Sequence, residues 1–221
     1  FIPNEEGDIL LSCDYSQIEL RVLAHMSDDK NMIDAFNNHS DIHTKTASEV
    51  FKVPIDEVTP LMRSRAKAVN FGISDFSLSQ DLKITKKEAS EYMEIYFDRY
   101  PKIKGYLESV KEEAKEKGYV LTVLNRRRFI PEIKSSNKIV KALGERLAMN
   151  APIQGSAADI IKLAMVKVYN RMKRENLQSE MILQVHDELI LNVKHDELEI
   201  VKSLVKEEME NVLNMSVALE V

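Results

Sequence analysis

The stretch Asp8-Ile9-Leu10-Leu11-Ser12-Cys13-Asp14 predicts a short buried strand that ends in a carboxylate. Two further apolar runs, 181–185 and 189–193, are separated by His186-Asp187-Glu188 and predict a hairpin with acids at its tip. A last strand is expected over 217–221, and the long segment between the strands is mostly helical in pattern. The sequence therefore predicts an α+β fold whose antiparallel sheet is interrupted by a large helical insertion.

Local signals set the bounds of the first inserted helices. Thr59-Pro60 is an N-cap followed by proline at the first helical position, and it opens a helix through Phe71 that closes near Gly72. Thr85-Lys86-Lys87-Glu88 is a capping box, and the helix that it begins is expected to continue until Pro101.

Local signals also set the bounds of the expected elements in the second half of the chain. Gly118 is expected to end a helix, and the segment 119–130 to form a small hairpin. A long helix from about Asn137 should bend at Pro152. A further helix is expected over 196–214.

Composition excludes several classes of protein. The 221 residues are 44% hydrophobic and 30% charged, which excludes wholesale disorder and low-complexity structure. The single Cys13 cannot form an internal disulfide, so a reducing compartment is expected. No run approaches the length of a membrane span and the first residues lack the regions of a signal peptide, so we expect a soluble, intracellular protein with no membrane partner.

Charge is unevenly distributed. The net charge of −5 by itself argues weakly against a nucleic-acid partner. Residues 121–150, however, carry seven basic and two acidic side chains, a net +5, while residues 1–20 carry five acids and no base. Such a split fits one surface that holds a phosphate backbone and another that holds cations. Ordinary fluctuation of surface charge along a chain is the alternative.

Carboxylates follow apolar strands at two places. Asp14 ends the first strand, and Asp187 with Glu188 lies between two others, so rigid elements could bring them together. Adjacent carboxylates repel unless cations neutralise them, and Mg²⁺ prefers such hard oxygen ligands together with substrate phosphates. Two such ions close together catalyse in-line phosphoryl transfer in two-metal enzymes. The alternative is that these acids are solvated turn residues.

The helix after Pro60 carries two cations and an aromatic ring on one face. Arg63, Lys67 and Phe71 stand four residues apart and fall on one face. Two cations followed by an aromatic ring fit a nucleoside triphosphate lying along the helix. Alternatively, the cations are solvated and Phe71 belongs to the core.

Three ordered motifs resemble those of family A DNA polymerases. They are Asp14-Tyr15-Ser16-Gln17-Ile18-Glu19-Leu20-Arg21, then Arg63-Ser64-Arg65-Ala66-Lys67-Ala68-Val69-Asn70-Phe71-Gly72, then Gln184-Val185-His186-Asp187-Glu188. Segments between them fit as well, including 41–44, 125–128 and 150–159. The resemblance spans essentially the whole chain and is far more specific than a short pattern. It implies a palm formed by 1–23 and 141–221, with fingers at 24–140.

The resemblance also implies the site residues. Asp14, Asp187 and the backbone carbonyl of Tyr15 would bind two Mg²⁺ ions, with Glu188 as an auxiliary acid. The residues implied to contact the incoming deoxynucleoside triphosphate are Gln17, Glu19, His43, Arg63, Lys67 and Phe71. The residues implied to contact primer–template DNA are Arg126, Arg127, Arg128, Arg146, Asn150, Gln154 and His186.

Individual roles follow from the same resemblance. Arg63, Lys67 and His43 would grip the triphosphate, and Lys67 would also protonate the leaving group. Phe71 would contact the sugar and base of the nucleotide, and Glu19 would block a ribose 2′-hydroxyl.

The chain departs from the family pattern after Gly72, which runs directly into Ile73-Ser74-Asp75. About four residues, close to one helical turn, are missing there, among them a tyrosine that gates the template. A shortened helix and a carboxylate at Asp75 off the nucleotide-facing stripe are expected. Ser64 also replaces a second arginine. The thumb and part of the palm of the family would precede Phe1, and its last strand would follow the end of this chain.

The resulting hypothesis is a template-directed DNA polymerase segment, monomeric and located in the bacterial cytoplasm or nucleoid, acting on primer–template DNA and deoxynucleoside triphosphates. A two-metal nuclease would explain Asp14 and Asp187 but not the stripe of Arg63, Lys67 and Phe71. A non-catalytic nucleic-acid-binding remnant of such a polymerase would explain the lost turn but not the retained aspartates and Lys67.

Overall fold

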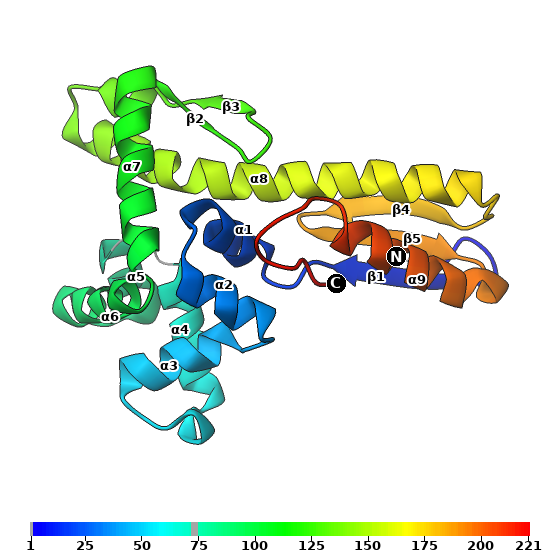
Figure 1. The fold of residues 1–221 in the computed structure, drawn as a ribbon, viewed down its shortest axis with the longest axis horizontal. Coiled ribbons are helices and arrows are strands. Elements are labelled where there is room, and N and C mark those ends of the chain that lie inside the picture. The colour runs from blue at the N-terminus through cyan, green and yellow to red at the C-terminus, as the bar shows by residue number, and fades with distance from the viewer. Residues whose placement is uncertain (1, 72–74) are drawn as a thin grey trace.

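The computed structural model describes residues 2–71 and 75–221 (Figure 1). The described strands are β1 (Ile9–Asp14), β2 (Tyr119–Leu121), β3 (Arg127–Phe129), β4 (Glu180–Val185) and β5 (Glu188–Val193). The described α-helices are α1 (Ile18–Ser27), α2 (Lys30–Asn37), α3 (Ile42–Phe51), α4 (Pro60–Phe71), α5 (Asp75–Leu82), α6 (Lys86–Arg99), α7 (Pro101–Lys117), α8 (Lys138–Arg174) and α9 (Leu198–Glu210). Helices inserted between antiparallel strands confirm the predicted α+β class.

The larger sheet joins the two ends of the chain. Its strand order is β1-β5-β4 and both pairings are antiparallel, so the N-terminal strand lies beside the second strand of the C-terminal hairpin. Leu189, Leu191 and Val193 of β5 are fully buried because they face a core that α8 and α9 complete. The predicted hairpin with acids at its tip is confirmed.

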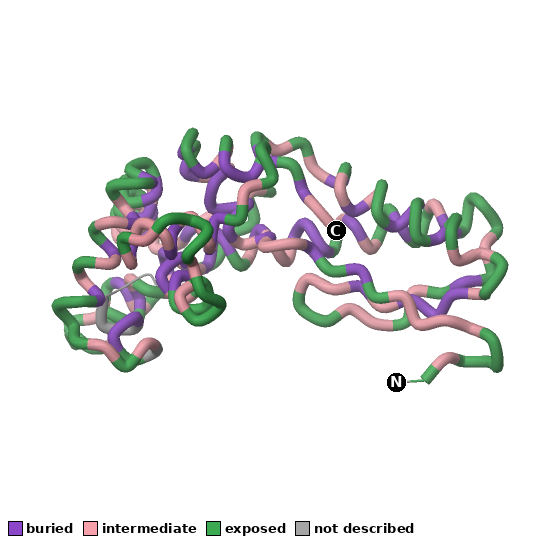
Figure 2. The backbone as a smooth tube through the Cα atoms, turned by 90° about the horizontal axis from the view of Figure 1, so that it is seen from below, coloured by how far each residue is buried: buried purple, intermediate pink, exposed green. Residues whose placement is uncertain are grey.

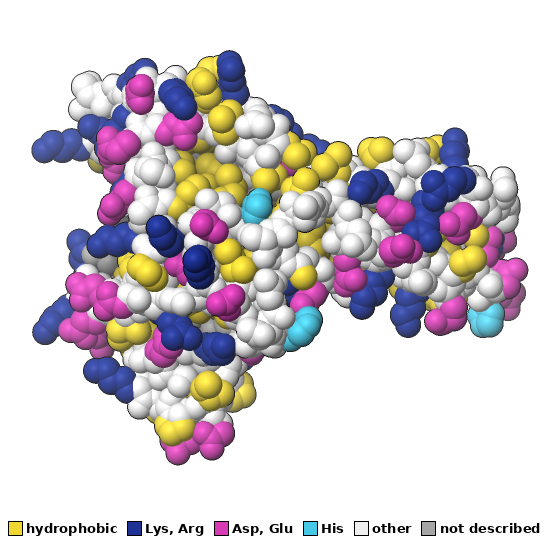
Figure 3. All heavy atoms as spheres, in the orientation of Figure 1, with side chains coloured by type: hydrophobic (Ala, Val, Ile, Leu, Met, Phe, Trp, Pro, Cys, Tyr) yellow, Lys and Arg dark blue, Asp and Glu magenta, His cyan; other side chains and the backbone are white. Residues whose placement is uncertain are grey.

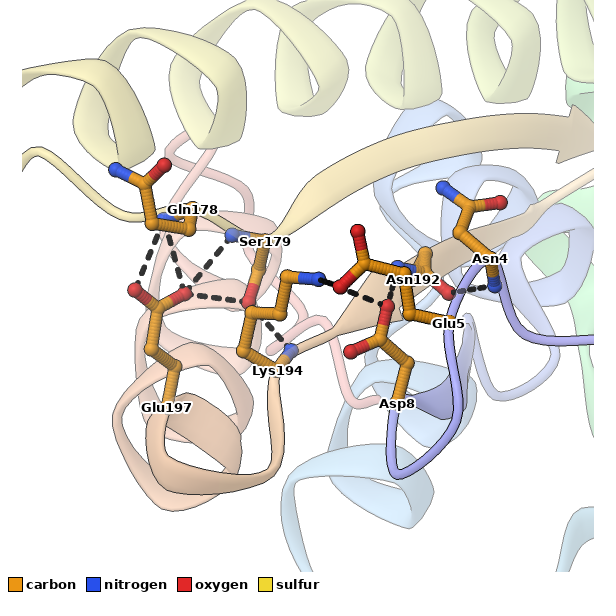
Figure 4. A network of polar contacts seen from close by, with 8 residues as sticks. All are labelled: Asn4, Glu5, Asp8, Gln178, Ser179, Asn192, Lys194 and Glu197. Atoms are coloured by element: carbon orange, nitrogen blue, oxygen red, sulfur yellow. Dashed lines mark hydrogen bonds and ion pairs between the residues drawn. The ribbon is translucent and has the colours of Figure 1, made fainter.

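Polar contacts fix the end of this sheet that lies away from the acidic tip (Figure 4). Lys194 Nζ contacts Glu5 at 2.7 Å and Asp8 at 3.1 Å, and the Asn192 amide donates to Asp8 at 2.7 Å. Glu197 accepts hydrogen bonds from the backbone N–H groups of residues 178 and 179. The Lys194 and Asn192 contacts hold the segment before β1 against the end of β5, and the Glu197 contacts hold the segment before β4.

Helix α8 connects the sheet to the inserted helices (Figure 1). It is one helix of 37 residues and continues without interruption through Pro152, where the sequence predicts a bend. Ala148, Ala151 and Ile153 are all buried, so packing on both sides of the proline holds the helix together. At its N-terminal half α8 packs against α7 and the β2–β3 hairpin, which confirms the predicted hairpin at 119–130.

The inserted helices begin and end where the local signals predict. Helix α4 ends at Phe71, α6 begins with the Thr85–Glu88 capping box, and α7 ends at Gly118 in the left-handed conformation with φ of 79°. Buried residues gather where these helices meet and along the inner faces of α8 and α9 (Figure 2). No helix in the described ranges is long and apolar enough to cross a membrane.

Two predictions at the C-terminus are wrong. Residues 217–221 form no strand, although Val217 and Leu219 are buried in alternation with more exposed neighbours. The side chain of Arg21 donates to the Ala218 carbonyl, so a buried side chain rather than a neighbouring strand satisfies this segment. The preceding helix is also shorter than predicted, because a 3₁₀ turn occupies 195–197 and α9 ends at residue 210.

Candidate active site

Strand pairing brings the two acidic strand ends together. Asp14, the last residue of β1, is the register partner of Glu188, the first residue of β5. The Tyr15 N–H donates to the Asp187 carbonyl oxygen at 3.2 Å. The carboxylates predicted at separate positions of the sequence therefore meet at one end of the sheet.

These acids influence one another. Burial, followed by the charges of Asp187 and Glu188, raises the pKa of Asp14 above its ordinary value. Burial and then the charge of Asp187 likewise raise the pKa of Glu19. The Ser12 hydroxyl donates a hydrogen bond to Glu188. Because each negative charge makes its neighbour harder to ionise, a cation placed here would be strongly favoured.

The donors present suit a hard divalent cation. Within the described ranges, no three His, Cys, Asp or Glu side chains converge as a ready-made metal cluster. Mg²⁺ does not need one, since it combines one or two carboxylates with substrate phosphates and water. Tyr15 anchors the backbone beside the two aspartates, because its ring is buried and its hydroxyl donates to the Met209 carbonyl at 2.7 Å. Asp14, Asp187 and the Tyr15 carbonyl therefore fit Mg²⁺.

An open cavity of about 560 Å³ lies beside Asp187. Gln17, Glu19, Gln154 and His186 are among the residues that line it. Gln17 precedes α1 in the left-handed conformation, with φ of 53°, and its Oε1 is buried without a hydrogen-bond partner in the part of the chain that the structure describes. Most buried acceptors have a hydrogen-bond partner, so Gln17 Oε1 is an exception among the described residues.

The two cations predicted on α4 are exposed, one turn apart. Arg63 Nε lies 2.6 Å from Oδ2 of Asp41, which caps the N-terminus of α3. Burial acts in the opposite direction, yet hydrogen bonds from Arg63 and Thr44 lower the pKa of Asp41 to about 2. Arg63 is therefore paired with a permanently charged carboxylate, whereas Lys67 lies further along the same exposed face.

His43 is a buried, neutral imidazole near these cations. Burial, and next the positive charge of Arg63, lowers the pKa of His43 to about 4. The Asn70 side chain lies 2.7 Å from His43 Nδ1 and accepts a hydrogen bond from Thr46 at 3.0 Å. Because the Asn70 amide can only donate to a ring nitrogen, the proton of the neutral ring resides on Nε2. The Nε2–H group is therefore the donor of the neutral ring.

Part of the predicted nucleotide site lies beyond the residues that the structure describes. Phe71 is the last residue of α4, and its side chain lies outside the described residues. The shortened turn predicted after Gly72 and the side chain of Asp75 also lie outside them.

The β2–β3 hairpin and α8 enclose a groove of about 540 Å³. The described residues that line it include five of those expected to contact DNA: Arg126, Arg127, Arg128, Asn150 and Gln154. Gln154 also lines the cavity beside Asp187, where His186 is exposed, while Arg146 is exposed on α8. Acidic and basic side chains intermingle on the face of the molecule seen in Figure 3, so the basic character belongs to the hairpin segment rather than to that whole face.

Three supporting residues escaped the sequence analysis. Asp159 is buried in α8 and contacts Arg126 at 2.6 Å and the Thr122 hydroxyl at 2.6 Å, so it ties the hairpin to the helix. Asp41 and Asn70 orient Arg63 and His43 as described above. Each lies inside a segment that resembles the family, but only Asp41 carried a local signal, namely an aspartate directly before a helix.

A pair of strand-end carboxylates, together with exposed cations on a neighbouring helix, is typical of proteins that act on phosphoryl groups. Comparison with known proteins identifies the family to which the chain belongs within this class. Residues 1–221 match DNA polymerase family A, and the chain belongs to that family.

Its relatives are bacterial. The chain is 55% identical over 225 residues to DNA polymerase I of Caldicellulosiruptor bescii and 52% identical to that of Bacillus subtilis, in each case over 100% of this chain and 26% of the relative. A solved structure described as the POL domain of Pol1 from M. smegmatis, in complex with DNA primer-template and dNTP, superimposes with a TM-score of 0.93. That similarity has 48% identity and covers 99% of this chain and 39% of the other.

The chain spans about a quarter of the length of the curated relatives it matches. The alignment with the C. bescii protein covers all 221 residues yet extends over 225 positions, an excess of four (225 − 221). This excess equals the number of residues that the sequence analysis expects to be missing after Gly72.

Proposed function

We propose that this chain is the catalytic segment of a template-directed DNA polymerase, which adds deoxynucleotides to a primer 3′-hydroxyl and releases pyrophosphate. The observation that carries the proposal is the pairing of β1 with β5, which sets Asp14 beside Asp187 and Glu188. The names of the bacterial relatives, and the primer-template and dNTP bound in the similar structure, support these substrates. In this proposal 1–23 and 141–221 form the palm, and 24–140 form the fingers.

Asp14, Asp187 and the Tyr15 carbonyl would hold two Mg²⁺ ions. When bound, such ions lower the pKa of the attacking hydroxyl and stabilise the departing pyrophosphate. The protein must then hold together acidic side chains that repel one another in the absence of a cation. The β1–β5 hydrogen bonds and the buried Tyr15 ring support that task.

The helical residues would bind and select the nucleotide. Arg63 and Lys67 would neutralise the triphosphate, and His43 would donate a hydrogen bond to it as a neutral group. Lys67 would also give a proton to the leaving pyrophosphate. Glu19, which lines the cavity beside Asp187, would occupy the space that a ribose 2′-hydroxyl needs.

Primer–template DNA would lie along the groove between the β2–β3 hairpin and α8. The three consecutive arginines would contact phosphates and fix the position of the duplex. We further propose that the natural protein acts as a monomer in the bacterial cytoplasm or nucleoid.

Extension of a 5′-labelled primer on a longer template tests the proposal. The natural full-length protein, with Mg²⁺ and the four deoxynucleoside triphosphates, should lengthen the primer, and chelation of the metal should stop it. Shortening of the primer by the same Asp14-dependent site would instead favour the two-metal nuclease. Binding of DNA with neither outcome would favour the non-catalytic remnant.

A further inference from the structure

The outer face of the β2–β3 hairpin carries two aromatic rings beside an arginine. The strand register pairs Tyr119 with Phe129, and Arg127 lies two residues before Phe129 on the same face. Val120, on the opposite face, is buried against α7 and α8, so the face with the rings is the outer one. The Tyr119 and Phe129 rings meet edge to face with centroids 5.8 Å apart. The guanidinium of Arg127 lies over the Tyr119 ring, 4.9 Å from its centroid.

Phe129 is unusually exposed for so large an apolar side chain. Its exposed fraction is 68%, and it lines the groove between the hairpin and α8. The exposed side chains of Arg126, Arg127 and Arg128 line the same groove, and no acidic residue is among the described residues of its wall. An exposed aromatic ring among cations is suited to a partner that offers both flat rings and negative charge.

A strand of nucleic acid with unpaired bases has this combination. Proteins bind such strands in positively charged grooves that follow the phosphates, with aromatic side chains on which the bases stack. Inside a duplex each base is already stacked on its neighbours and is not accessible to a protein ring. In the primer–template of the proposed reaction, the unpaired strand is the template ahead of the primer end.

We propose that Phe129 stacks on an unpaired base of the template strand, while the arginines of the hairpin hold the phosphates of the adjoining duplex. The inference rests on the proposed function, since that function places DNA in the groove between the hairpin and α8. It adds the kind of strand that contacts the outer face of the hairpin, and it assigns the contact to one side chain.

Two DNA probes that differ only in their bases test the stacking. Both have the same labelled duplex and a template overhang of the same length, made of thymidines in one probe and of abasic residues in the other, so their phosphate charges are equal. Binding to the natural full-length protein is measured by fluorescence anisotropy with divalent cations chelated, so that the DNA stays intact. Phe129→Ala should weaken binding of the thymidine probe about 5- to 150-fold, the effect of one stacked base, and leave binding of the abasic probe unchanged within about twofold.

Three further variants separate stacking from other roles. Phe129→Trp keeps an aromatic face and should bind the thymidine probe within about twofold of the unchanged protein. Phe129→Leu keeps an apolar contact with Tyr119 but has no ring, so it should bind both probes as Phe129→Ala does, and it replaces that variant should the alanine protein not fold. Tyr169→Ala is the matched control, because Tyr169 is 50% exposed near the C-terminal end of α8, whereas the hairpin packs on the N-terminal half (Figure 1). It should change neither affinity.

Arg128→Ala distinguishes a failure of this inference from a failure of the proposed DNA groove. It should weaken binding of both probes, because it removes a phosphate contact that both possess. Weaker binding in Arg128→Ala but not in Phe129→Leu would overturn the stacking and leave the groove, whereas an unchanged affinity in both variants would show that DNA does not lie there. Equal loss of both probes in Phe129→Leu, together with a lower melting temperature, would also overturn the proposal, since Phe129 would then only support the hairpin.

Discussion

The acidic strand ends of this molecule and its basic side chains on α4 and the β2–β3 hairpin lie in opposite electrostatic surroundings. Asp14 lies among like charges, which raise its pKa. Arg63 and Arg126 each have a carboxylate partner, Asp41 and Asp159 respectively, at 2.6 Å. The strand-end site would therefore gain free energy by binding a cation, whereas the basic side chains would exchange one anion for another if, as proposed, they bind phosphate.

Removal of one strand-end charge should have the largest effect. In the natural full-length protein, Asp14→Asn or Asp187→Asn should reduce primer extension at least about 10³-fold, because each removes a charged metal ligand from a site whose chemistry is largely electrostatic. Single-turnover extension measures the rate. If both single variants retained more than a tenth of it, the two-metal assignment would be wrong.

The same variants should not destabilise the fold. The raised pKa of Asp14 means that its ionisation opposes folding as the pH rises above the ordinary carboxyl pKa. Asp14→Asn should therefore melt no lower than the unchanged protein at neutral pH. Asp34→Asn, which alters an exposed acid on α2, is the matched control and should change neither the rate nor the melting temperature.

Glu19 sharpens the comparison, because it is an acid that we propose to act at the nucleotide rather than at the metal. If its side chain fills the space that a 2′-hydroxyl needs, Glu19→Ala should raise the kcat/KM ratio of ribonucleotide to deoxynucleotide by about 10- to 200-fold, the usual range for small steric discrimination. Steady-state incorporation of paired nucleotides measures this ratio. An unchanged ratio would make Glu19 a structural acid only.

The sequence predicted those parts of the fold that local signals specify. The capping box at Thr85, the end of α7 at Gly118 and the apolar strands on either side of the acidic tip all follow from neighbouring residues alone. The prediction of a strand over 217–221 is wrong because alternating burial does not require a neighbouring strand. A distant side chain, Arg21, satisfies that backbone instead.

The sequence identified which residues belong to the candidate site, but not which side chains they contact in the fold. The carboxylates and the α4 cations were found because motifs carry them at fixed spacing. Asp159 was not, since its contact with Arg126 depends on how the β2–β3 hairpin folds back onto α8 over a separation of more than thirty residues.

Substitution of Asp159 tests whether this residue positions the arginines of the β2–β3 hairpin or only neutralises the charge of Arg126. Asp159→Asn loses the ion pair with Arg126, so the hairpin should hold its arginines less firmly and DNA affinity should fall about threefold to tenfold. The dependence of affinity on salt should stay the same, because no phosphate contact has been removed. Arg128→Ala is the comparison variant and should lower the salt slope by about one unit. Fluorescence anisotropy at several salt concentrations distinguishes the two.

Asp41 should give the smallest effect and the most direct test of anion exchange. Asparagine caps a helix as well as aspartate does, so Asp41→Asn keeps the cap of α3 and removes only the charge that holds Arg63. An exposed ion pair is worth about 0.2–1 kcal/mol, so freeing Arg63 for the triphosphate should lower the KM for deoxynucleotides at most about fivefold. Because the pKa of Asp41 is about 2, the carboxylate is charged throughout the assay range, and the effect should be equal at pH 6 and pH 8. A raised KM would show that Asp41 orients Arg63 toward the nucleotide instead of competing with it, and the contrast between the two regions would then rest on the strand-end acids alone.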